Sequence, residues 1–238
     1  MRWFRDARLR SLLNQRQVKV SLDCLLLSDD DAEVTSAKVS PARVPQEERT
    51  RVMRQRLLEA TVECLVEHGW SGTSTTLVSQ RAGVSRGAQL HHFPTKDDLV
   101  LAAVEHLTER RGEDLREAAQ QLPSGKRRTR AVLEMFADHF TSPVFTAALE
   151  LWVAARTDEA LHAAVVPLEQ RVGREAHRIA VEALGVDERQ PRVRELVQAT
   201  LDLVRGLGLA NTISDDATRR HKILAAWAHT LDAELKKG

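Results

Sequence analysis

The chain has 238 residues, of which 42% are hydrophobic and 29% charged, and it contains 11 glycines and 7 prolines. This is the composition of a folded globular protein, and it excludes a fibrous or wholly disordered chain. Two cysteines are too few for a disulfide framework or a four-cysteine zinc site. No apolar stretch reaches the roughly 18 residues that a membrane span needs, and none near the start forms the core of a signal peptide. We therefore expect a cytoplasmic protein with no membrane partner.

The charges are unevenly distributed along the chain. The net charge is only +1, from 35 basic and 34 acidic residues, but residues 68–96 contain no Asp or Glu, where an even distribution would place about four. Arg81, Arg86 and Lys96 make this segment locally basic. A basic segment on a nearly neutral chain suits a polyanion that touches one face. The alternative is an accident of composition.

Residues 1–45 differ from the rest of the chain and are predicted to form a disordered extension. They carry scattered arginines, an acidic run at residues 29–33, and prolines at positions 41 and 45. Val18, Val20 and Leu22 alternate with polar residues as in a strand, but no second run of this kind exists to pair with it.

From residue 46 onward the apolar residues recur with helical spacing. Glycines, prolines and capping residues divide this part into segments, and the fold class is therefore predicted to be all-α. Pro167 is expected to kink its helix or to split it. The expected helices cover about residues 47–68, 74–82, 86–92, 96–121, 126–140, 145–156, 158–184, 191–211 and 216–236.

Two short helices around residues 74–82 and 86–92 are joined by Ala82-Gly83-Val84-Ser85, which predicts a helix-turn-helix. Glycine suits the sharp reversal at the turn, and the second helix of such a motif enters the major groove of DNA. The first helix ending at Gly69, the paired threonines, the Ala-Gly-Val-Ser-Arg-Gly-Ala sequence and the His-Phe-Pro-Thr-Lys ending together resemble the TetR-type family of one-component transcriptional regulators. The resemblance covers about residues 50–100.

The chain departs from the family pattern at one place. Such proteins usually carry Leu-Tyr-Tyr-His-Phe, whereas this chain has Gln89-Leu90-His91-His92-Phe93 and no tyrosine at all. Gln89 thus stands at the family's core leucine position, and Leu90 at the position of its phosphate-binding tyrosine. Either the helix rotates so that Leu90 packs inward, or Gln89 is free to reach a base edge.

The helix-turn-helix supplies the candidate DNA contacts. The guanidinium of Arg86 can bind guanine O6 and N7, and the amide of Gln89 can bind adenine N6 and N7. The other candidates suit phosphate oxygens, except that His91 could reach either a phosphate or a base edge. For Thr75 and Ser85, a role as a helix cap alone is the alternative, and His92 is expected to be structural. The full set is Thr75, Thr76, Ser85, Arg86, Gln89, His91 and Lys96.

The histidines also allow a metal-site interpretation, which the spacing disfavours. Adjacent histidines on a helix, such as His91 and His92, point about 100° apart, and no His-Glu-x-x-His pattern is present. Gly-rich phosphate loops, Gly-x-Ser-x-Gly elbows and Cys-His pairs are also missing from the sequence. We expect no metal, no cofactor and no enzymatic activity. A helical metal-dependent enzyme is kept as the alternative from another functional class.

Aromatic residues gather between residues 136 and 152 on two successive predicted helices. They could form a plain hydrophobic core, but the family resemblance implies a sensor whose middle helices enclose an effector. A few polar groups beside an apolar patch are what orients a small ligand. The resemblance therefore implies a small, mainly apolar effector molecule, with the candidate residues Phe136, His139, Phe140, Leu149, Trp152 and His162.

The last two predicted helices each carry an apolar stripe. These stripes can close onto the same chain or onto a second copy, and the resemblance favours a homodimer through these two helices. We therefore divide the chain into the extension (1–45), a helix-turn-helix DNA-binding domain (46–95) and an effector-binding and dimerisation domain (96–238). The expected function is that of a repressor released from double-stranded operator DNA by its effector. The alternative is a constitutive DNA-binding protein without an effector.

Overall fold

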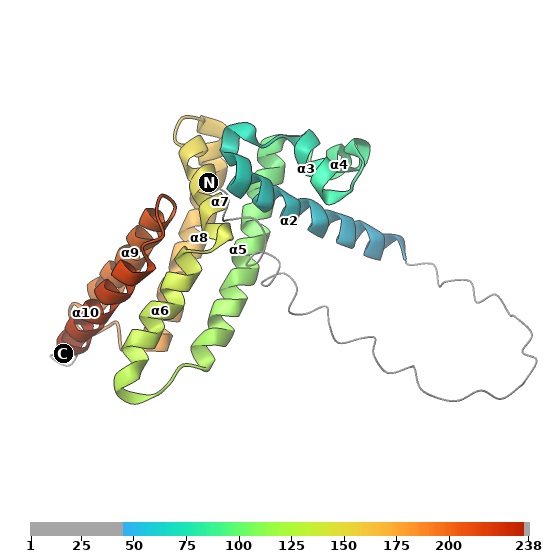
Figure 1. Cartoon of the computed structure of the whole chain (residues 1–238). Coiled ribbons are helices and arrows are strands. Elements are labelled where there is room, and N and C mark those ends of the chain that lie inside the picture. The colour runs from blue at the N-terminus through green and yellow to red at the C-terminus, as the bar shows by residue number, and fades with distance from the viewer. Residues whose placement is uncertain (1–44, 236–238) are drawn as a thin grey trace, which may run out of the picture. The chain divides into compact units, whose positions relative to one another are not determined.

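The computed structural model describes residues 45–235, which belong to one unit and are helical without any strand in that range (Figure 1). The all-α prediction is confirmed. The predicted extension and the strand-like run at residues 18–22 lie outside the described residues. The α-helices are α2 (Gln46–Gly72), α3 (Thr75–Ala82), α4 (Arg86–His92), α5 (Lys96–Gln120), α6 (Arg128–Phe140), α7 (Pro143–Ala155), α8 (Glu159–Leu184), α9 (Val193–Asn211) and α10 (Ala217–Leu235).

Capping side chains set most of the helix starts. The hydroxyl oxygens of Ser74, Ser85 and Ser142 accept hydrogen bonds from backbone N–H groups in the first turns of α3, α4 and α7. Thr95 and Asp98 form a reciprocal capping box at the start of α5. Because these signals are local in sequence, the predicted starts lie close to the observed ones.

α8 runs through Pro167 as one helix, so the predicted split does not occur. The ring removes one backbone donor and leaves the carbonyl of Ala163 without its usual partner. Both Pro167 and Ala163 are exposed, so water can satisfy that carbonyl. The proline is therefore tolerated at this position within α8.

The buried side chains form two hydrophobic cores. The first joins α2, α3 and Phe93 to α5, α7 and the start of α8; the second joins α6, α9 and α10 to the rest of α8. Trp152 packs against both cores. The helix-turn-helix thus shares its core with helices that the sequence assigns to the next domain. A movement of α5 or α7 therefore acts directly on the helices that carry α3 and α4.

α6 and α9 approach each other closely at one glycine. A Cβ atom added at Gly208 would overlap the backbone carbonyl of Phe140. This close approach lies within one chain. None of the helices between residues 45 and 235 is long and apolar enough to cross a membrane.

Candidate functional site

α3 and α4 form the predicted helix-turn-helix. Gly83 ends α3 in the left-handed conformation with φ of 64°, and the N–H of Val84 donates to the carbonyl of Ser79 at 3.0 Å. The turn therefore needs a residue that tolerates positive φ, as the sequence indicates. Several candidate DNA contacts are exposed around it: Thr76, Ser85, Arg86 and His91.

Gln89 is buried, contrary to both outcomes considered from the sequence. Its side chain has no exposed surface, and its Nε2 donates to the carbonyl of Phe93 at 2.6 Å. Leu90 is 41% exposed, so the helix has not rotated to pack it inward. The side-chain amide of Gln89 lies on the buried face of α4, where its hydrogen bond to the carbonyl of Phe93 at the end of the same helix pairs it. The expectation that Gln89 reaches a base edge is therefore corrected.

The three basic residues of the acid-free segment have different surroundings. Arg81 forms ion pairs with Glu67 and Glu63 on α2. Lys96 donates from Nζ to the carbonyl of Trp70, and its ammonium lies 4.3 Å from the centroid of the Trp70 ring. Burial lowers the pKa of Lys96. Arg86 is exposed and makes no hydrogen bond or ion pair with any described residue, so its guanidinium is the freest of the three.

Thr75 is half-buried at the first position of α3, where Ser74 rather than Thr75 provides the cap. Ser85 does cap α4, through its hydroxyl and the N–H of Ala88. Gly87 was missed by the sequence analysis. It is exposed on α4, and an added Cβ would meet nothing within 4 Å. In the sequence, the available signal was a glycine inside a predicted short helix, where glycine is usually unfavourable.

A cavity of about 50 Å³ lies among α5, α6, α7, α8 and α9. Three of the six candidate effector residues line it, namely His139, Phe140 and Trp152. The other lining residues are Val104, Thr108, Ser142, Val144, Phe145, Ala148, Leu151, Leu168, Glu169, Val172, Ala176 and Arg205.

The remaining three candidates are not at the cavity. Phe136 is fully buried in the second core, and Leu149 packs against the same core. His162 is exposed on the first turns of α8, whereas that helix reaches the cavity further along, at Leu168. These three residues therefore do not line this cavity, and their part in effector binding stays a prediction. Phe136, Leu149 and His162 were chosen because they are apolar or lie near the aromatic residues in the sequence. Neither property decides which neighbouring helix a residue faces.

The apolar wall of the cavity is a chain of aromatic rings. The rings of Phe140 and Phe145 meet edge to face with centroids 5.2 Å apart, and those of Phe145 and Trp152 with centroids 6.0 Å apart. His139 stacks edge to face on the other side of Phe140 at 5.1 Å. Such contacts hold each ring in a defined orientation. The wall is therefore an ordered apolar surface made of rings set nearly perpendicular to one another.

The polar wall contains the imidazole of His139, the carboxyl group of Glu169 and the guanidinium group of Arg205. Burial lowers the pKa of His139 to about 4, and the positive charges of Arg111 and Arg205 act in the same direction. Arg205 lies 3.9 Å from Glu169, whose pKa is raised by burial. Arg111, Glu169 and Arg205 are not among the site residues predicted from the sequence. For Arg205, a charged residue within the apolar run at residues 203–207 was an available signal.

α7 connects the cavity to the helix-turn-helix. Trp152 on this helix lines the cavity, while Glu150 accepts a hydrogen bond of 2.7 Å from the backbone N–H of Trp70 in α2. Trp70 in turn receives the ammonium of Lys96 at the start of α5. The end of α2, the start of α5 and the middle of α7 thus meet at Trp70.

The apolar stripe of α9 is buried within its own chain. Val197, Leu201 and Val204 lie in the second core, and Trp227 of α10 donates from Nε1 to the hydroxyl of Thr200 at 3.0 Å. The stripe therefore closes onto the same chain. The residues that stay exposed on α9 and α10 include small ones and two larger ones, namely Ala199, Gly206, Ala225, Leu209 and His229.

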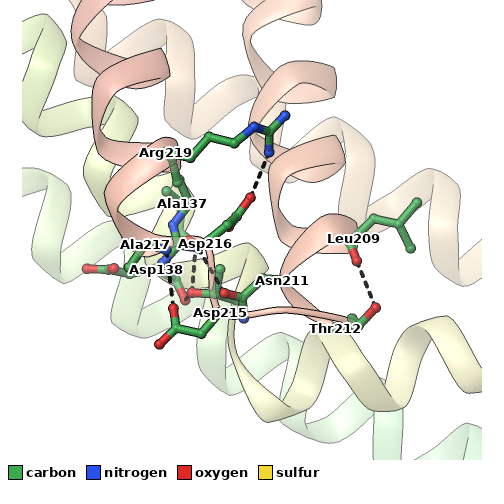
Figure 2. A network of polar contacts seen from close by, with 11 residues as sticks. Ala137, Asp138, Leu209, Asn211, Thr212, Asp215, Asp216, Ala217 and Arg219 are labelled. Atoms are coloured by element: carbon green, nitrogen blue, oxygen red, sulfur yellow. Dashed lines mark hydrogen bonds and ion pairs between the residues drawn. The ribbon is translucent and has the colours of Figure 1, made fainter.

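Polar contacts fix the turn between α9 and α10 (Figure 2). The hydroxyl of Thr212 donates to the carbonyl of Leu209 at 2.7 Å, and Asp216 pairs with Arg219 at 2.7 Å. The N–H of Ala217 donates to the carboxylate of Asp215 at 3.2 Å. These contacts fix the end of α9 and the start of α10. Within residues 45–235, no three His, Cys, Asp or Glu side chains gather closely enough to hold a metal ion.

The family model described as "Bacterial regulatory proteins, tetR family" matches residues 57–103, which include α3, α4 and the start of α5. The HTH-type transcriptional regulator CymR of Pseudomonas putida is 31% identical over 191 residues, a region that spans 78% of this chain and 92% of CymR.

Solved structures show the same fold. A transcriptional regulator of Pseudomonas aeruginosa PAO1 superimposes with a TM-score of 0.57 at 28% identity, covering 81% of this chain and 94% of that one. The FadR regulator of Bacillus subtilis, solved in complex with stearoyl-CoA, has a TM-score of 0.57 at 15% identity and covers 74% and 96% of the two chains. The similarity thus extends from the helix-turn-helix through most of the helical part that follows. The chain belongs to the TetR family of bacterial helix-turn-helix transcriptional regulators.

Proposed function

We propose that this regulator is a repressor that binds operator DNA as a homodimer and leaves it when a small, mainly apolar effector occupies the cavity beside Trp152. The observation that carries the proposal is the position of α7. One face of this helix lines the cavity through Phe145 and Trp152, and Glu150 on the same helix bonds the end of α2. An effector that displaces α7 therefore displaces a helix that carries the helix-turn-helix.

On the DNA side, Arg86 is the proposed base-reading residue, because its exposed guanidinium is not engaged elsewhere in the described chain. Thr75, Thr76, Ser85 and His91 are proposed to contact phosphate oxygens. Lys96 joins them, since an ammonium has three donors and the carbonyl of Trp70 takes only one. At Gly87 the absence of a side chain lets α4 approach the groove closely.

On the effector side, the cavity is small for a ligand. Its volume of about 50 Å³ is well below the roughly 300–1,000 Å³ of ordinary ligand pockets. Binding therefore requires that α5, α7 or α8 move apart, and the effector stabilises that expanded arrangement. Couplings between two such sites are typically about 1–3 kcal/mol, which changes operator affinity some 5 to 150 fold.

For the dimer, we propose that the exposed faces of α9 and α10 meet the same faces of a second copy. A single helix-turn-helix reads too few base pairs for a specific site, so two must be held about one DNA turn apart. Residues 46–95 then act as the DNA-binding domain and residues 96–238 as the effector-binding and dimerisation domain. The small exposed residues Ala199, Gly206 and Ala225 permit close approach.

The small cavity also favours the alternative, a constitutive DNA-binding protein with a filled core. The two functions are separated by selecting an operator from random duplex DNA and then titrating the complex with apolar compounds of graded size. Trp152→Ala should leave operator affinity near that of the parent and weaken the response to any compound that releases DNA. A specific operator complex that no compound dissociates supports the constitutive function. Release of DNA that is unchanged in Trp152→Ala shows that Trp152 is only a core residue.

A further inference from the structure

The polar wall of the cavity holds hydrogen-bonding groups that the protein itself does not satisfy. Nε of Arg205 and Nδ1 of His139 are buried and have no hydrogen-bond partner among the described residues. The same is true of Nε of Arg111, whose positive charge acts on His139. Buried polar atoms are almost always paired, because an unpaired one costs a large part of its hydration energy. His139 and Arg205 line the cavity, so their unpaired atoms can take a partner from outside the chain, either water or a ligand.

Arg205 is held loosely enough to accept such a partner. Its Nη atoms lie 3.9 Å from Glu169 and 3.8 Å from Asp202, which are distances of ion pairs without a direct hydrogen bond. Its guanidinium carbon lies 5.6 Å from the centroid of the Phe140 ring. The group is therefore placed against the aromatic wall at the edge of the cavity, with donors free.

Positive charge at this wall comes from Arg205 in the lining and from Arg111 nearby, each of which also faces a surface carboxylate, Asp202 or Asp114. His139 is neutral at physiological pH, and Glu169 is the carboxyl group in the lining. Burial raises the pKa of Glu169, so a proton can be added to it at smaller cost than to an exposed carboxylate. A protonated Glu169 also becomes a donor. The wall then offers donors from the guanidinium of Arg205, the imidazole of His139 and the protonated carboxyl group of Glu169.

We propose that the effector is a small carboxylic acid, whose carboxylate is bound by Arg205 and His139 and whose compact apolar body lies against Phe140, Phe145 and Trp152. The planar fork of a guanidinium matches the two oxygens of a carboxylate. Arg111 adds its positive charge from α5. This assignment rests on the proposed function, because it names the ligand of the same cavity.

The assignment also explains how binding and movement are coupled. The carboxylate bridges α6, which carries His139, and α9, which carries Arg205, while its apolar body presses on α7. α6 and α9 are already locked together by the contact of Gly208 with Phe140. α7 is therefore the helix that yields, and its Glu150 is bonded to the backbone N–H of Trp70.

The test uses the full chain and matched sets of probes: hexanoate, octanoate, benzoate and naphthoate, each with its primary amide and its primary amine. Binding is measured by calorimetry and by the shift in melting temperature, and release is measured on the selected operator. The acids are expected to bind and to release DNA, and the amides and amines to bind at least about tenfold more weakly.

Arg205→Met keeps the apolar stem and removes the guanidinium, so it should weaken acid binding by about tenfold to a hundredfold. Arg194→Met is the matched control on the exposed face of α9 and should bind the acids like the parent. If Arg205→Met fails to fold by circular dichroism, Arg205→Lys takes its place. It keeps the charge but not the fork, and weaker acid binding is again expected.

Three results overturn the assignment: amides that bind as well as acids, amines that bind in place of acids through Glu169, and unchanged acid binding in the Arg205 variant. If neutral apolar compounds release DNA and the acids do not, the effector is not a carboxylic acid. The proposed function as a ligand-responsive repressor is then still supported. If no acid, amide, amine or neutral apolar compound alters a specific operator complex, the effector response fails as well. The unpaired buried atoms of His139 and Arg205 are then hydrogen-bonded to water alone.

Discussion

The carboxylate of Glu150 on α7 accepts a 2.7 Å hydrogen bond from the backbone N–H of Trp70 on α2, 80 residues earlier in the chain. The contact is tight, because a Cβ atom added at Gly69 would lie 3.1 Å from an oxygen of Glu150. Gly69 itself has φ of 64°, which turns the chain at the end of the regular part of α2. α7 is thereby fastened to the helix that supports α3.

This joint predicts that Glu150→Ala weakens the effector response more than it weakens the fold. The variant leaves the N–H of Trp70 without its partner, so the free energy of unfolding should fall by about 1–3 kcal/mol. The concentration of effector that releases half of the operator should rise by a larger factor than in Glu113→Ala, a control at an exposed position of α5. Stability lost with an unchanged release curve would show that the joint is structural only.

The DNA contacts predict different effects for Arg86 and Lys96. Arg86→Ala should weaken operator binding by about 1–3 kcal/mol and relax the preference at one base pair. Lys96→Ala should weaken binding to all sequences about equally and lower the salt slope by about one. Both are measured by fluorescence anisotropy over a range of salt. A uniform loss for Arg86→Ala would assign this residue to phosphate.

Gln89→Leu provides a control within the same helix. The substitution removes a buried amide whose Oε1 has no hydrogen-bond partner within the described chain and restores an apolar side chain. Base preference should stay as in the parent. The free energy of unfolding should not rise, because the substitution also removes the buried hydrogen bond from Nε2 to the carbonyl of Phe93. A changed base preference would mean that Gln89 leaves the interior when DNA is bound.

His139 predicts a dependence of stability on pH. Its folded pKa of about 4 lies below the ordinary value of 6.5, so the unfolded chain binds the proton more tightly. The free energy of unfolding should therefore fall as the pH drops from 6.5 toward 4, by up to about 3 kcal/mol from this group. The raised pKa of Glu169 acts in the opposite direction, because its proton stabilises the folded state at low pH.

The measurement is denaturant unfolding at a series of pH values for the parent and for His139→Gln. The difference between the two curves isolates the imidazole, since Glu169, Arg111 and Arg205 remain in both proteins. The parent should lose more stability than the variant between pH 6.5 and 4. Parallel curves would show that His139 is protonated in the folded protein without cost.

The variants that test the dimer leave the buried apolar stripe of α9 unchanged. Leu201 is 2% exposed, so a charge there would disrupt the core of the chain itself. Gly206→Glu combined with Ala225→Glu places charges on the exposed faces of α9 and α10 instead. Sedimentation should give a folded monomer with little specific operator binding. Val153→Glu, at a 67% exposed position of α7, should stay dimeric, and a dimeric double variant would place the interface elsewhere.

Much of the fold follows from local features of the sequence. Ser85, Thr95 and Gly83 set the limits of α4, α5 and α3 through contacts within four or five residues, so their effect can be read without knowing any distant neighbour. The acid-free segment around the turn likewise marked the DNA-binding part. Local chemistry thus determined the all-α class and the helix-turn-helix.

The tertiary structure decided which side of each helix meets which neighbour. The sequence placed Gln89 toward DNA, but packing turns it inward, where the carbonyl of Phe93 accepts its amide. His162 proved to be exposed, while Arg205, separated from His139 by 66 residues, lies at the same cavity. Such contacts join helices far apart in the chain. The periodicity of one helix shows that it has a buried face, but the partner of that face is set by the packing of all the helices together.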